Sequence, residues 1–158
     1  MSLPDELGSS LKARNWTVAV AESCTGGKLG DMITSVPGSS DYFLGGVISY
    51  SNSAKVGLLS VDPEVIRSEG AVSEKVALQM AEGARIVFGA DMGVSTTGVA
   101  GPGGGSPEKP VGLAYVAVST RDGGACRKVM SAGARDEIKR KSSESALALA
   151  IEHLADRE

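Results

Sequence analysis

Short apolar runs that alternate with segments of helical spacing limit the folds open to this chain more than any other feature. Residues 17–22 form one such run, and they follow a helical segment with leucines at spacing four. Residues 46–50 and 92–97 form two more, each after a further helical segment. Strands that are separated by helices pair in parallel and are covered by those helices on both faces. The pattern therefore predicts a three-layer α/β/α domain.

The last third of the chain carries a hairpin signal instead. Residues 112–120 and 125–131 flank the turn sequence R-D-G-G. A hairpin adds antiparallel strands, so we expect a mixed α/β sheet of about five strands. The expected helices cover residues 3–15, 25–36, 52–59, 63–67, 73–88 and 136–156.

Length and composition indicate a single domain over residues 1–158. A chain of 158 residues can bury a core without disulfides, and its 42% hydrophobic and 22% charged residues are ordinary globular values. With a net charge of −3 and one basic patch at residues 139–141, the sequence does not indicate a basic surface for binding nucleic acid. Neither a membrane-spanning run nor a signal peptide is visible, so we expect a cytoplasmic protein that contacts no membrane.

The few cysteines and histidines also exclude classes of site. Two cysteines and one histidine cannot supply the clustered ligands of a zinc or iron–sulfur centre, so no metal and no cofactor are expected. His153 lies near the end of the last expected helix, where we expect a solvated side chain. Histidine-dependent catalysis is therefore not expected.

Two glycine clusters invite comparison with phosphate-binding loops, and neither fits. The sequence Gly26-Gly27-Lys28 lacks both the earlier glycine and the following Ser or Thr of a Walker loop. Residues 101–105 lie between two expected strands rather than at the start of a helix, which excludes the dinucleotide fingerprint. This second cluster is either a mobile surface loop or a lid over a substrate.

The stretch A-E-S-C-T-G-G, residues 21–27, joins an expected strand to an expected helix. In an open α/β sheet, ligands collect at the carboxyl ends of strands, where a helix N-terminus offers free N–H groups. Gly26 and Gly27 allow a ligand to approach this backbone closely, and Ser23 is placed as an attacking hydroxyl. The alternative is that Ser23 or Thr25 only caps the helix.

A serine nucleophile needs a base, and without histidine the remaining candidate is a lysine held neutral. Ser51 or Asn52 is a suitable N-cap, so Lys55 falls in the first helical turn, where the helix dipole disfavours an ammonium group. The alternative for Lys55 is a solvated surface side chain. Tyr50 ends the preceding strand, where it either relays a proton or binds the substrate, or else packs with its hydroxyl in water.

The sequence resembles the CinA-like C-terminal domain through five motifs in order. They are A-E-S-C-T-G-G, V-P-G-S-S-D-Y-F-L-G-G-V-I-S-Y-S-N-S-A-K, G-A-V-S-E, T-G-V-A-G-P-G-G-G and E-K-P-V-G, and the resemblance covers residues 11–154. This is the family of nicotinamide mononucleotide (NMN) amidohydrolases, also called competence/damage-inducible domains, and it is similar in fold to anticodon-binding-like domains. The resemblance implies hydrolysis of the NMN carboxamide to nicotinate mononucleotide and ammonia in pyridine nucleotide (NAD) recycling, without a metal.

Motif by motif, the resemblance implies that Ser23 is the nucleophile, Lys55 the base and Tyr50 the supporting tyrosine. Arg135 takes the place of the arginine in the family's G-D-R motif and is the candidate for the nucleotide phosphate. This chain has Ala134 where the motif has its acid, so a surface role for Arg135 stays open as an alternative. The implied substrate-binding residues are Thr25, Gly26, Gly27, Thr97, Gly98, Gly101, Gly103 and Arg135.

Many relatives carry an extra N-terminal domain, whereas this chain resembles the stand-alone form. The resemblance also implies a homo-oligomer, with a dimer favoured. Two other functions stay open. One is a non-catalytic nucleotide-binding or regulatory module, and the other is an enzyme in which Cys24 is the nucleophile, although we expect Cys24 to face the core as a small apolar residue.

Overall fold

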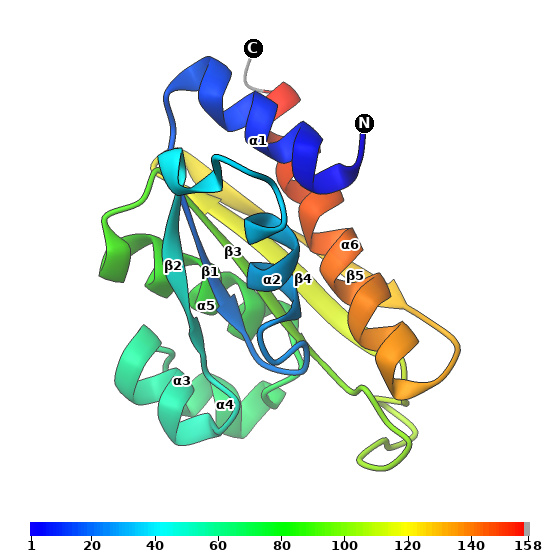
Figure 1. Cartoon of the computed structure of the whole chain (residues 1–158). Coiled ribbons are helices and arrows are strands. Elements are labelled where there is room, and N and C mark those ends of the chain that lie inside the picture. The colour runs from blue at the N-terminus through cyan, green and yellow to red at the C-terminus, as the bar shows by residue number, and fades with distance from the viewer. Residues whose placement is uncertain (157–158) are drawn as a thin grey trace.

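A five-stranded mixed sheet lies between two layers of helices in the computed structural model, which describes residues 1–156 (Figure 1). The strand order is β2-β1-β3-β4-β5, in which β1 pairs in parallel with β2 and β3 while β4 and β5 are antiparallel. The predicted three-layer fold with a mixed sheet is therefore confirmed. The strands are β1 (Val18–Glu22), β2 (Phe43–Ile48), β3 (Met92–Gly98), β4 (Leu113–Thr120) and β5 (Gly123–Met130).

The helices divide between the two faces of the sheet. One face is covered by α1, α2 and α6, whose buried side chains form the larger core cluster with the central strands. The other face is covered mainly by α5, against which α3 and α4 pack. No helix within residues 1–156 has both the length and the apolar character needed to cross a membrane. The helices are α1 (Leu3–Arg14), α2 (Lys28–Thr34), α3 (Asn52–Leu59), α4 (Pro63–Glu69), α5 (Glu74–Phe88) and α6 (Arg135–Ala155).

Strand β1 explains where the site forms. All five of its residues are buried, as expected of a central strand covered on both faces. Because β2 and β3 run parallel to β1, the carboxyl ends of all three strands reach the same edge of the sheet. Ser23 follows β1, Tyr50 comes shortly after β2, and Thr97 lies at the end of β3.

The observed bounds of β2 differ from the expected ones. The sequence predicts residues 46–50, whereas the strand covers Phe43–Ile48. A bulge shifts the register so that Val18 pairs with Phe43 but Ala19 pairs with Gly45. Gly45 has φ 138°, and a Cβ at this position would lie 2.9 Å from the ring of Phe88. Burial still alternates along the strand, but Gly45 and Gly46 place no apolar side chain in its middle, so the sequence shows no apolar pattern of period two there.

The close approach of α3 to α5 fixes the position of Lys55. A Cβ on Gly83 of α5 would lie 2.2 Å from the carbonyl oxygen of Leu59, at the end of α3. Leu59 is buried in the core beneath α5, so α3 cannot retreat without opening that core. Lys55 lies one turn earlier on α3 and is therefore held by the same contact.

We predict that Gly83→Ala destabilises the protein by about 1–3 kcal/mol, because its methyl group would overlap backbone that cannot move. Gly57→Ala in α3 is the matched control, since no atom lies within 4 Å of its Cβ position. Alanine is the better helix former, so this variant should be more stable by about 0.5–1 kcal/mol. Urea unfolding measures both. If Gly83→Ala and Gly57→Ala changed the free energy of unfolding by equal amounts in the same direction, the packing argument would be contradicted.

Candidate active site

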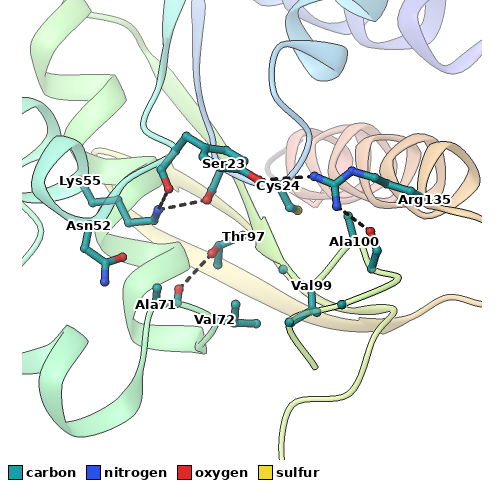
Figure 2. Close-up of a pocket in the computed structure, with 15 residues that line it drawn as sticks. Ser23, Cys24, Asn52, Lys55, Ala71, Val72, Thr97, Val99, Ala100 and Arg135 are labelled. Atoms are coloured by element: carbon teal, nitrogen blue, oxygen red, sulfur yellow. Dashed lines mark hydrogen bonds between the residues drawn. The ribbon is translucent and has the colours of Figure 1, made fainter. Parts of the chain in front are cut away.

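A cavity of about 290 Å³ lies at the carboxyl ends of the parallel strands (Figure 2). It is lined by eight of the site residues suggested by the sequence, which come from four separate segments of the chain. The sequence-based site is therefore largely brought together at one place. These eight are Ser23, Tyr50, Lys55, Thr97, Gly98, Gly101, Gly103 and Arg135.

Ser23 and Lys55 face each other in the wall of this cavity. Lys55 Nζ lies 3.0 Å from Ser23 Oγ, and it donates hydrogen bonds to the carbonyl oxygens of Ser49 at 2.7 Å and Tyr50 at 3.2 Å. Only 1% of Lys55 and 8% of Ser23 is exposed. The Ser51 hydroxyl accepts the N–H of Ala54, so Ser51 is the N-cap that sets the first turn of α3 and the direction of Lys55.

The surroundings of Lys55 favour its neutral form. Burial lowers the pKa of the Lys55 amine from its ordinary 10.5, and only the nearby Cys24 opposes this shift. No carboxylate in the described part of the chain forms an ion pair with it. A neutral amine has two protons and one lone pair. The carbonyls of Ser49 and Tyr50 can take the two protons, which leaves the lone pair facing the Ser23 hydroxyl.

Thr25, Gly26 and Gly27 do not line the cavity, contrary to the expectation of an open helix N-terminus. The N–H of Gly26 donates to the carbonyl of Ser23 at 3.1 Å, and the N–H of Gly27 donates to the Glu22 carboxylate at 3.1 Å. Thr25 is fully buried, and its hydroxyl also bonds to Glu22. The cap of α2 is therefore the side chain of Glu22, neither Ser23 nor Thr25, and α2 begins at Lys28 rather than Thr25.

Tyr50 and Arg135 form one rim of the cavity. Nη1 of Arg135 donates to the carbonyl of Gly101 at 2.6 Å, and Nη2 lies 3.4 Å from the Tyr50 hydroxyl. Arg135 reaches the cavity from the first turn of α6. Because both side chains are exposed, the remaining N–H groups of the Arg135 guanidinium stay available to a ligand. Ala134, which replaces an acid of the family motif, does not prevent this contact.

Some lining residues carry no recognisable signal in the sequence. The sequence suggests Asn52 only as a helix cap, but Ser51 caps α3, and Asn52 lines the cavity. Ala71 and Val72 come from the connection between α4 and α5. The Thr97 hydroxyl donates to the Ala71 carbonyl at 2.9 Å and so anchors this connection to β3. Small apolar residues in a loop have no chemical pattern that would predict such a contact.

Cys24 is next to Ser23 but is a poor nucleophile. Burial raises the pKa of its thiol to about 11, and only 7% of the residue is exposed. Burial likewise raises the pKa of the Cys126 thiol to about 11. A thiol reacts as its thiolate, so neither cysteine is activated. Across residues 1–156, no three His, Cys, Asp or Glu side chains gather in a way that could hold a metal ion.

We predict that iodoacetamide at pH 7.5 labels both cysteines about 100-fold or more slowly in the native chain than in the urea-unfolded chain. The unfolded thiols return to their ordinary pKa, which raises the thiolate fraction. Peptide mass spectrometry separates the Cys24 and Cys126 rates. Fast labelling of native Cys24 would contradict the account of its burial and revive the cysteine as a nucleophile.

Comparisons with known proteins agree with the fold and with the motifs. The family model described as the CinA C-terminal domain matches residues 1–154. The CinA-like protein of Chlorobaculum tepidum is 53% identical over 153 residues, which cover 93% of this chain and 36% of that protein. The chain thus spans about a third of the length of the curated relatives it matches.

Two solved structures share the fold. The competence/damage inducible protein CihA from Agrobacterium tumefaciens superimposes with a TM-score of 0.93 at 38% identity, covering 97% of this chain and 93% of that one. The competence damage-inducible protein A from Klebsiella pneumoniae superimposes with a TM-score of 0.94 at 32% identity, covering 99% of this chain and 97% of that one. Their names state no reaction.

Proposed function

Because the chain belongs to the CinA C-terminal domain family, we propose that it is an amidohydrolase acting on the carboxamide of NMN, in pyridine nucleotide recycling. The observation that carries the proposal is the buried Lys55 amine, 3.0 Å from Ser23 Oγ, at an open cavity. A serine with a neutral lysine is a known arrangement for acyl transfer where no histidine is available. The resemblance of the motifs supplies the choice of NMN.

The proposed reaction proceeds through an acyl-enzyme. Neutral Lys55 takes the proton of Ser23 as Oγ attacks the carboxamide carbon. The protonated lysine then gives its proton to the amide nitrogen, and the carbon–nitrogen bond breaks so that this nitrogen leaves as ammonia. A water molecule, deprotonated by the same lysine, attacks the ester. Nicotinate mononucleotide is released, and the proton passes back to Ser23.

Two further roles complete the proposal, one for Arg135 and one for Tyr50. The donors of Arg135 that are not used by Gly101 or Tyr50 are available to the phosphate. Tyr50 would then orient Arg135 as well as line the pocket.

We predict that the native chain converts NMN to nicotinate mononucleotide without added metal, and that Ser23→Ala lowers kcat by about three orders of magnitude or more. Lys55→Arg should be equally inactive because arginine cannot act as a neutral base. Mass spectrometry follows the product, and thermal unfolding checks that each variant is folded.

The outcome also separates the enzyme from a non-catalytic nucleotide-binding module. A native chain that binds NMN in calorimetry but releases no product would support the binding module and contradict the amidase. Equal product from native chain and Ser23→Ala would contradict the assignment of the nucleophile.

A further inference from the structure

The strand that leads to Ser23 ends in a buried carboxylate that the proposed mechanism does not use. Glu22 is only 2% exposed, and no cation within residues 1–156 forms an ion pair with it. Four donors surround it instead, which is enough to satisfy a buried carboxylate. Oε1 accepts from the Thr25 hydroxyl at 2.5 Å, the Gly27 N–H at 3.1 Å and the Leu29 N–H at 2.9 Å, while Oε2 accepts from the Gly30 N–H at 2.9 Å.

The proton directions in this network follow from the carboxylate. A carboxylate only accepts, so the single proton of the Thr25 hydroxyl points to Glu22. The Thr96 hydroxyl lies 2.7 Å from the Thr25 hydroxyl and must therefore donate to it. The carbonyl of Thr96 accepts the N–H of Ser23 at 3.1 Å. Glu22 is thus linked to both sides of the Ser23 turn, through Thr25 after the serine and through Thr96 opposite it.

This arrangement differs from an ordinary helix cap. An ordinary cap is the residue just before the first turn, and its side chain satisfies one or two N–H groups. Here Gly27 holds that position, while the capping side chain comes from the end of β1, five residues earlier. The carboxylate therefore ties strand, turn and helix together. It also uses the N–H groups that could otherwise attract an anion, so the substrate phosphate must bind elsewhere.

We propose that Glu22, acting through Thr25, is a positioning residue that holds Ser23 Oγ within reach of Lys55 Nζ. The inference rests on the proposed function, since it assigns Glu22 to the attack by Ser23. Displacement of a nucleophile by about 1 Å can cost about 100-fold in rate while substrate binding is retained. A loss in kcat at nearly constant KM therefore distinguishes positioning from a merely structural cap.

The most direct test compares Thr25→Val with Thr25→Ser. Valine removes the hydroxyl at nearly constant volume, whereas serine keeps it. We expect Thr25→Val to lower kcat about 10- to 100-fold with KM within about twofold, and Thr25→Ser to retain kcat within about threefold of the native chain. Glu22→Gln should lower kcat at least as much as Thr25→Val does. Its amide nitrogen, itself a donor, would face either the Gly30 N–H or the donors on the other side, and so would break part of the network.

The control is Glu152→Gln, which makes the same chemical change at an exposed residue that pairs with Arg127 on the surface, and it should leave kcat unchanged. Unfolding temperatures are measured for all variants. If Glu22→Gln does not fold, the comparison of Thr25→Val with Thr25→Ser still tests the proposal. Native kcat in folded Thr25→Val, whatever its unfolding temperature, would overturn the proposal.

A fluorophosphonate probe separates this inference from the choice of substrate. The probe forms a phosphorus–oxygen bond with an activated serine and expels fluoride, so it needs no NMN. If the native chain does not hydrolyse NMN but is labelled at Ser23, the proposed function fails while the role of Glu22 can still be tested by the labelling rates. Labelling of Thr25→Val about tenfold slower than that of the native chain supports the positioning role, and equal rates overturn it. A native chain that is neither active nor labelled overturns both.

Discussion

The buried amine of Lys55 is the constraint on which the rest of the site depends. An ammonium group without a counter-ion costs several kcal/mol to bury, so the amine is held neutral or the fold is destabilised. The carbonyls of Ser49 and Tyr50 accept its two protons, which requires the chain to turn sharply between β2 and α3. The one remaining direction at Nζ is toward Ser23. The burial of Lys55, its hydrogen bonds and the reactivity proposed for Ser23 are therefore consequences of one arrangement.

The scaffold supplies this arrangement from both sides. On the lysine side, the Ser51 cap and the contact of Gly83 with Leu59 fix the first turn and the end of α3. On the serine side, the carboxylate of Glu22 holds the turn that carries the hydroxyl. Both sides depend on the parallel pairing of β1 and β2, which brings two strand ends to the same edge of the sheet.

Sequence reasoning predicts the layers of the fold and the pairing of Ser23 with Lys55, because alternating strands and helices place strand ends together regardless of detail. It fails where tertiary contacts decide. Glu22 lies too far before α2 to be recognised as its cap. Gly45 and Gly46 give β2 no apolar pattern in its middle, which conceals the start of the strand. Arg135 reaches Tyr50 from 85 positions away, and no local pattern encodes such a contact.

Titration of the Lys55 amine by NMR tests the central claim most directly. Lysine labelled with ¹³C at Cε and ¹⁵N at Nζ reports the protonation of each amine, and the Lys55→Arg variant identifies the resonance by its absence. The account predicts that this amine titrates below the ordinary lysine value of 10.5, so that its neutral fraction at any given pH exceeds that of the surface lysines. Titration at 10.5 or above would show a charged amine in the folded protein and would contradict the account.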